Sequence, residues 1–368
     1  MSRPLLSTMY SLMDSRETIS QPWQEVLVYG AGGFGSTIRP LLETLGAHVV
    51  GVIDRRASSD ESSALTAAQA FSEYGDLPVI LGVFSPQPNV HEISQHLSSI
   101  GFSNVVSPPR LMHLLSDFGV RFRRYWLSSY TEDLRLPNIA IEAVFNSLRD
   151  PSSRDTFQQL ICYRLSGDIK YSPIPLPLDD QYVGSRSSFL ETASSKTFVD
   201  CGAFTGDSIL NWERAGAQPS TVFALEPDPS NFNALVATLD ICSTSVIPFR
   251  VGVSNQSGLF SLEGDGPSAT LVNSPNGSVQ CTTIDELVGS EHVSLIKMDI
   301  EGSEMSALQG ATKTISRDHP HLAISVYHRP ADLWEIPAWI TYNFPGYRLS
   351  LATYGHQGYD TVLYATWN

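Results

Sequence analysis

The chain has 368 residues, of which 42% are hydrophobic and 17% are charged, and its formal net charge is -15. This length predicts two α/β domains, and the composition is typical of a globular protein. Only four lysines are available to neutralise phosphates, which argues against nucleic acid or an anionic membrane as a partner. No apolar run is long enough to span a membrane, no signal peptide is recognisable and the four cysteines stand singly, so we expect a cytoplasmic protein.

The first 118 residues predict an N-terminal arm followed by a small domain. Residues 1–24 have no strong periodicity and form the arm. Over 25–118, apolar runs that predict strands alternate with amphipathic spacing that predicts helices. Strands are expected at 26–29, 48–53, 79–84 and 104–107, where Pro108 and Pro109 end the last one, and helices at 37–45 and 90–100. This order predicts a Rossmann-like α/β domain with a parallel sheet.

A glycine-rich turn, Gly30-Ala31-Gly32-Gly33-Phe34-Gly35, follows the first expected strand, and Asp54 ends the second. In this context a G-x-G-x-x-G turn can hold the pyrophosphate of a dinucleotide, with the acidic side chain on a ribose. Such turns also serve only to pack a helix against a strand. Both interpretations stay open.

Residues 119–195 are expected to connect this domain to the rest of the chain. Residues 120–170 have mostly helical spacing, interrupted at Pro151. Residues 171–180 contain three prolines, which favours an extended strap over a helix. This strap is the clearest boundary in the sequence.

A second, larger α/β domain is predicted over 196–368. Strands are expected at 197–200, 221–225, 246–251, 293–298 and 322–326, with helices that begin near Asp207, Ser230 and Ser303. The alternation implies a parallel sheet with helices on both faces. The last two strands, 347–352 and 361–366, have no room for a helix between them, so we expect an antiparallel hairpin at the sheet edge.

The glycine loop of this second domain differs from the first because carboxylates flank it. Asp200 precedes Gly202, Asp207 follows Gly206, and Glu226 ends the next strand. Two acidic side chains would repel a pyrophosphate, but not a ligand that carries a sulfonium and an ammonium. S-adenosylmethionine (SAM) is such a ligand, and Glu226 would accept hydrogen bonds from its ribose hydroxyls. The simpler interpretation of the two aspartates is a loop and helix-capping role.

Five segments in this order resemble the FkbM family of SAM-dependent methyltransferases. They are D-x-G-A-x-x-G-D at 200–207, E-P-D-P at 226–229, Gly252-Val253-Ser254, Thr282-Thr283-Ile284-Asp285 and D-x-E-G-x-E at 299–304. The resemblance covers roughly residues 196–368 and implies a class I methyltransferase, Rossmann-like seven-stranded sheet. The N-terminal domain is similar to the extra Rossmann-like domain of longer members. The family's usual activity implies O-methylation of a hydroxyl on a small molecule, natural product or sugar.

The resemblance and the charge argument together place SAM against the glycine loop and the strand ends. The expected cofactor-binding residues are Asp200, Gly202, Ala203, Phe204, Thr205, Gly206, Asp207, Glu226, Pro227, Asp228, Gly252, Val253, Asp299, Ile300 and Glu301. Tyr182, near the strap, is expected on resemblance alone to cover the cofactor. The expected partner is a small-molecule or glycan acceptor, and the oligomeric state, with a homo-oligomer as one option, stays open.

The catalytic residues are expected at the carboxyl edge of the sheet, where Asp299 follows one strand and His328 follows its neighbour. We assign the base role to His328, because a histidine pKa lies near neutrality, and place Asp299 on the methionine or acceptor side. The simpler interpretation of a lone histidine is structural. Glu304 is expected to cap the next helix, and the role of Glu301 stays open. Asp299, Glu301 and His328 would hold a divalent metal if they converged, but the sequence does not show convergence, and no metal is predicted.

Two functions of other classes stay open. A nicotinamide-dependent oxidoreductase would use Gly30, Gly32, Gly35 and Asp54, although no hydride-handling residues follow in that domain. A non-catalytic module would hold SAM or its product in the second glycine loop as a sensor. An open acceptor pocket beside the bound cofactor distinguishes an enzyme from such a module.

Overall fold

The computed structural model of the chain describes Met9 and residues 23–57, 64–134, 138–183, 196–263 and 270–367. Most of the predicted N-terminal arm lies outside these residues. The chain divides into two compact units: unit 1 comprises residues 1–142, 155–175 and 355–359, and unit 2 comprises 143–154, 176–354 and 360–368. The predicted connector over 119–195 is thus shared between the two units, and the turn of the expected C-terminal hairpin belongs to unit 1.

Unit 1 contains a parallel four-stranded sheet in the order β2-β1-β3-β4, as the alternating pattern predicts. Its strands are β1 (Glu25–Tyr29), β2 (His48–Ile53), β3 (Val79–Leu81) and β4 (Val105–Val106), and its first helices are α2 (Gly33–Thr44), α3 (Ala67–Tyr74), α4 (Val90–Ile100) and α5 (Pro108–Asp117). Leu27, Val79 and Leu81 lie in its core with apolar side chains of α3 and α4. The two prolines after β4 open α5, because proline is well suited to the first helical positions.

The first glycine turn packs α2 closely against β1. A Cβ on Gly35 would overlap the backbone oxygen of Gly30, whereas Gly32 has open space around it. The Asp54 carboxylate accepts a hydrogen bond from the backbone N–H of Ala31 at 2.9 Å. Packing therefore requires the glycine at 35, and nucleotide binding by this turn stays a prediction.

The segment from 120 to 170 contains α-helices, as its helical spacing predicts. It contains α6 (Thr131–Leu134), α7 (Asn138–Ser147) and α8 (Pro151–Ser166), preceded by a short antiparallel hairpin of β5 (Arg123–Arg124) and β6 (Leu127–Ser128) that the sequence pattern does not predict. The proline-rich strap holds only two 3-10 turns, Ile169–Tyr171 and Leu178–Asp180, and no α-helix.

Unit 2 contains a seven-stranded mixed sheet in the order β16-β17-β15-β14-β7-β8-β9. Its strands are β7 (Thr197–Cys201), β8 (Thr221–Leu225), β9 (Val246–Phe249), β14 (Val293–Met298), β15 (His321–Ser325), β16 (Tyr347–Thr353) and β17 (Thr361–Trp367). β17 pairs antiparallel with β15 and with β16, while the other pairs are parallel. The predicted sheet and its antiparallel edge hairpin are confirmed.

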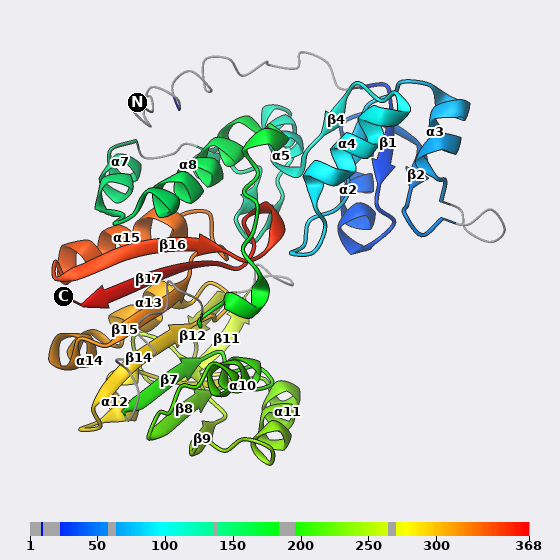
Figure 1. The fold of residues 1–368 in the computed structure, drawn as a ribbon. Coiled ribbons are helices and arrows are strands. Elements are labelled where there is room, and N and C mark those ends of the chain that lie inside the picture. Colours follow the sequence, from blue (N-terminus) through cyan, green and yellow to red (C-terminus); the bar gives the residue numbers. More distant parts are fainter. Residues whose placement is uncertain are drawn as a thin grey trace. The chain divides into compact units, whose positions relative to one another are not determined.

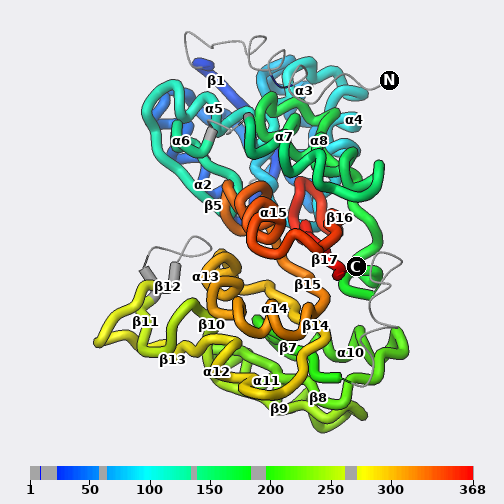
Figure 2. The backbone as a smooth tube through the Cα atoms, turned by 90° about the vertical axis from the view of Figure 1, so that its left-hand side faces the viewer, coloured from blue at the N-terminus to red at the C-terminus, as the bar shows by residue number. Residues whose placement is uncertain are grey.

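Helices cover both faces of this sheet. α10 (Asp207–Arg214) and α11 (Pro229–Leu239) lie on one face, as Figure 1 shows. α13 (Glu304–Gln309), α14 (Thr312–Asp318) and α15 (Asp332–Asn343) lie on the other, in front of the sheet in Figure 2. Phe198, Trp212 and Leu295 belong to the buried cluster between the sheet and α10. The right-handed crossovers that place these helices also bring the turns after β7, β8 and β14 to one edge.

A second, four-stranded sheet is inserted between β9 and β14, where the sequence pattern predicts only a loop. Its strands are β10 (Gly252–Val253), β11 (Gly258–Glu263), β12 (Thr270–Asn273) and β13 (Val279–Thr282), and α12 (Ile284–Val288) follows. They pair in the order β10-β13-β11-β12. Residues 264–269, between β11 and β12, lie outside the described residues.

None of the helices in the described parts of the chain combines the length and apolar character needed to cross a membrane. Cys162, Cys201, Cys242 and Cys281 are all free thiols.

Candidate functional site

The carboxyl ends of β7 and β14 lie at the point where the strand order of the seven-stranded sheet reverses. Ligands of open α/β sheets bind at such a point. The turn that leaves β7 contains Gly202, Phe204 and Gly206, all with positive φ. A Cβ on Gly202 would overlap the backbone oxygen of Asp299, so glycine lets the turns after β7 and β14 touch.

We expect Gly202→Ala to destabilise the chain by about 3 kcal/mol or more, because it adds steric overlap to the cost of a left-handed backbone. Gly216→Ala is the matched control. Gly216 also has a positive φ, but nothing lies within 4 Å of its Cβ position, so we expect only about 1–2 kcal/mol. Urea unfolding of both variants measures the difference, and equal losses would contradict the close contact.

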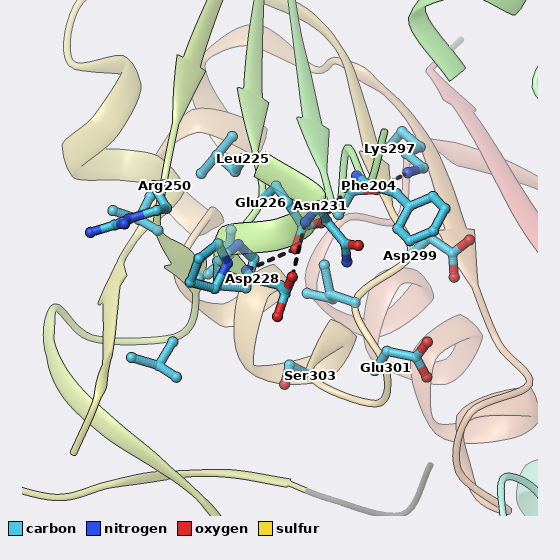
Figure 3. A pocket seen from close by; sticks show the side chains of 18 of the residues that line it. Phe204, Leu225, Glu226, Asp228, Asn231, Arg250, Lys297, Asp299, Glu301 and Ser303 are labelled. Atoms are coloured by element: carbon cyan, nitrogen blue, oxygen red, sulfur yellow. Dashed lines mark hydrogen bonds between the residues drawn. The ribbon is translucent and has the colours of Figure 1, made fainter. Parts of the chain in front are cut away.

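A pocket of about 850 Å³ opens beside this turn (Figure 3). Phe204, Val253 and Ile300 contribute apolar walls. Five carboxylates and two cationic side chains also line it: Asp207, Glu226, Asp228, Asp299, Glu301, Arg250 and Lys297. Figure 3 shows Asp299 and Glu301 at one side of the pocket and Arg250 at the other. This excess of negative charge favours a cationic ligand over a pyrophosphate.

Two backbone N–H groups hold the carboxylate of Glu226 in position. One carboxylate oxygen accepts a hydrogen bond from the N–H of Phe204 at 3.0 Å, and the other accepts one from the N–H of Asp228 at 2.9 Å. Burial raises the pKa of Glu226, and these two N–H groups oppose that shift. Each oxygen keeps a second lone pair, so the side chain can still accept hydrogen bonds from a diol.

Lys297 reaches from β14 to the end of β7 and holds the glycine loop in place. Its ammonium lies 2.9 Å from Oδ1 of Asp200 and donates to the backbone oxygen of Gly202 at 2.7 Å. Burial would lower the pKa of Lys297, but Asp200 and Asp299 more than compensate and raise it. Asp200 is fully buried and also accepts a hydrogen bond from Ser208. The ion pair therefore joins the two central strands beneath the pocket.

His328, which follows β15, lies among carboxylates. Its Nδ1 is 2.8 Å from Glu304 Oε1, while its Nε2 is 3.4 Å from Asp299 Oδ1 and 3.7 Å from Glu301 Oε2. Burial alone would lower the pKa of His328, but Glu304, Asp299 and Glu301 raise it to about 10. The imidazole is thus protonated at neutral pH. Glu304 also accepts a hydrogen bond from the N–H of Ile300 at 2.9 Å, in the turn before α13, and capping of that helix by Glu304 stays a prediction.

A further buried acid lies behind this cluster. Burial and the charge of Glu304 raise the pKa of Asp332 to about 8, against the hydrogen bond from the backbone N–H of Arg329. Asp360 behaves similarly, since burial and Asp299 raise its pKa to about 6. Acidic groups thus outnumber the single imidazole.

Most of the predicted cofactor residues line the pocket. They are Gly202, Phe204, Asp207, Glu226, Pro227, Asp228, Gly252, Val253, Asp299, Ile300 and Glu301. Tyr182 lines it as well, and its hydroxyl lies 3.4 Å from Asp299 Oδ2. Binding by these residues stays a prediction.

Five of the predicted site residues are not part of the pocket lining: Asp200, Ala203, Thr205, Gly206 and His328. Asp200 is fully buried and pairs with Lys297, so it does not face the pocket. His328 lies behind Asp299 with a side chain only 2% exposed. Sequence reasoning missed Lys297, although a charge inside the apolar run of β14 is the pattern that could have identified it.

Residues 200–357 match the family model described as the methyltransferase FkbM domain. This part of the chain is an FkbM methyltransferase domain. The match begins at the aspartate of the glycine loop and includes Glu226, Asp299 and His328, so the FkbM domain contains all the residues that line the pocket except Gln181 and Tyr182.

The chain is similar to two known proteins. The "Hexuronic acid methyltransferase AglP" of Haloferax volcanii is 39% identical over 106 residues, which span 26% of this chain and 43% of that protein. The crystal structure of "Methyltransferase FkbM from Methylobacillus flagellatus KT" has a TM-score of 0.76 at 21% identity, and the match covers 98% of this chain and 99% of that one. This second likeness concerns the fold, and it extends over both units.

Proposed function

We propose that the chain is a SAM-dependent O-methyltransferase whose acceptor is a hydroxyl of a sugar or another small molecule. The observation that carries the proposal is the acid-rich pocket at the switch point of an FkbM domain, with Glu226 at the end of β8. AglP is named as a hexuronic acid methyltransferase, which supports a sugar as the acceptor class.

The residues present fit SAM. Glu226 would hold the ribose hydroxyls, and Val253 and Ile300 would pack against the adenine. Asp207 and Asp299 would lie near the cationic methionine half, while the ammonium of Lys297 would attract its carboxylate. When bound, SAM supplies a methyl carbon activated by its sulfonium, so that the new C–O bond forms as the C–S bond breaks and the hydroxyl proton leaves.

We propose Asp299 and His328 as the groups that manage this proton. Asp299 lines the pocket and receives the proton of the acceptor hydroxyl. His328 cannot be the first proton acceptor at neutral pH, because its pKa of about 10 leaves the imidazole already protonated. The base role predicted for His328 therefore passes to Asp299, and His328 balances the charge of that carboxylate.

A hydroxyl suits this site better than a carboxylate does. A carboxylate acceptor needs no base and would meet Asp299 and Glu301 at like-charge distance, whereas a neutral hydroxyl needs a nearby base. Arg250, the other cationic residue of the pocket lining, lies at the opposite side of the pocket (Figure 3).

Transfer of labelled methyl groups from SAM to a panel of neutral sugars and hexuronic acids tests the proposal. We expect labelled product with neutral sugars, and a loss of about 100-fold or more in the Asp299→Asn variant. The label should resist mild alkali, which hydrolyses a methyl ester but leaves a methyl ether intact. Label that alkali releases would show a carboxylate acceptor. SAM binding without transfer to any acceptor of the panel would favour the sensor module.

A further inference from the structure

Two carboxylates, Asp299 and Glu301, each approach the imidazole of His328 beyond the ends of two neighbouring parallel strands, β14 and β15. His328 Nε2 lies 3.4 Å from Asp299 Oδ1 and 3.7 Å from Glu301 Oε2. These separations are long for hydrogen bonds. They match the spacing of about 3–3.7 Å between neighbouring ligand atoms that are bound to one divalent cation at about 2.0–2.6 Å.

Glu304 orients the imidazole in the way that metal sites require. Its Oε1 pairs with Nδ1 of His328 at 2.8 Å, which fixes the ring and turns Nε2 toward Asp299 and Glu301. The Glu304 side chain is fully buried, and its Oε2 has no hydrogen-bond partner among the described residues. One ligand atom each of Asp299, Glu304 and His328 lies within 4.8 Å of the other two, and the more exposed Glu301 is not part of this set. Three carboxylates around one imidazole leave negative charge that a bound cation would neutralise.

The cluster is open on the side that faces solvent. Asp299 has a side-chain exposure of 27% and Glu301 of 67%, whereas the His328 side chain is only 2% exposed. Glu301 has a φ of 55°, a backbone conformation that costs energy for a residue other than glycine. This arrangement provides a fixed nitrogen ligand, a fixed oxygen ligand and a third carboxylate that can rotate inward. It leaves further positions for water or a substrate oxygen.

We propose that His328 Nε2, Asp299 Oδ1 and Glu301 bind a divalent cation, with Glu304 as a positioning residue. Mixed imidazole and carboxylate ligands suit Mn²⁺ and related ions. The cation takes the place of the proton on Nε2. Its catalytic use rests on the proposed function: it binds the acceptor hydroxyl and makes that hydroxyl more acidic, while Asp299 Oδ2 still receives the proton.

Titration of the full chain with Mn²⁺ alone, after removal of metal by a chelator, tests the proposal. Free Mn²⁺ has a characteristic electron paramagnetic resonance spectrum that is lost on binding. We expect one saturable Mn²⁺ per chain, competed by Mg²⁺. Glu301→Gln should weaken binding at least about 10-fold, and Glu304→Gln about 10- to 100-fold. The exposed Glu291 of the same unit gives the matched control, Glu291→Gln, which should bind as the native chain does.

Glu301→Gln keeps the experiment informative if Glu304→Gln fails to fold, because the Glu301 side chain is largely exposed. No Mn²⁺ binding by the folded native chain, or equal binding by native and Glu301→Gln chains, would overturn the proposal. Binding of S-adenosylhomocysteine to the same samples separates the two claims. A chain that binds S-adenosylhomocysteine but no Mn²⁺ refutes only the metal site, and the reverse result refutes only the proposed function.

Discussion

Lys297→Met is expected to destabilise the chain by about 3–5 kcal/mol, because it leaves the buried carboxylate of Asp200 without its counter-ion. Asp200 is fully buried and Lys297 has a side-chain exposure of only 4%. The same substitution removes the hydrogen bond to the backbone oxygen of Gly202 and so loosens the glycine loop.

Urea unfolding of Lys297→Met beside Lys313→Met measures this effect, since Lys313 is an exposed lysine of the same unit. We expect the control to change the free energy of unfolding by less than about 0.5 kcal/mol. A double variant, Lys297→Met with Asp200→Asn, should recover part of the loss because it removes the unpaired charge as well. A loss below about 1 kcal/mol in Lys297→Met would show that the ion pair does not hold the two strands together.

In the chain freed of metal by a chelator, His328→Gln is expected to lose stability in a way that depends on pH. The pKa of His328 is raised to about 10 in the folded chain, from an ordinary value near 6.5. The folded state therefore holds a proton that the unfolded state releases. The stabilisation is fully present below about pH 6.5 and is lost as the pH rises toward 10. We expect the native chain to have a higher free energy of unfolding than the variant, and this difference should be about 3–5 kcal/mol larger at pH 6 than at pH 10.

Unfolding free energies of both chains at pH 6, 8 and 10 test this expectation. Asp332 contributes in the same direction to both chains, because its raised pKa of about 8 makes the folded state release its proton later than the unfolded state does. Because His328 lowers the pKa of Asp332, the difference between the two chains reports His328 together with its effect on this acid. A difference that stays constant over this pH range would show that the carboxylates around His328 do not raise its pKa.

The sheet of unit 2 could be predicted from the sequence because its strands are apolar runs with clear ends. β8 and β14 begin and end where the pattern places them, and α10 begins at the expected Asp207. The small sheet of β10 to β13 was missed because its strands are short and lack a continuous apolar run. β4 ends before Pro108, as expected, but α5, which Pro108 opens, was not predicted because a strand-ending proline does not show that a helix follows at once.

The lining of the pocket could be predicted in large part, since strand ends and glycine turns mark the ligand edge of an α/β sheet. Which side chains pair with one another around the pocket could not be predicted from the sequence. Glu304 and His328 are 24 positions apart, and Lys297 and Asp200 lie on different strands. Such contacts depend on the register of neighbouring strands. The raised pKa of His328 follows from these long-range contacts, which is why we propose Asp299 and not His328 as the base.

Calorimetric titration of the full chain with S-adenosylhomocysteine tests the central claim most directly, with Glu226→Ala and Glu226→Gln as test variants and Glu291→Ala as control. We expect the native and control chains to bind, and Glu226→Ala to bind about 100-fold more weakly, because two hydrogen bonds to a charged group are lost. Circular dichroism melting would confirm that each variant is folded. A folded native chain that binds NADH and not S-adenosylhomocysteine would contradict the account and move attention to the glycine turn of unit 1.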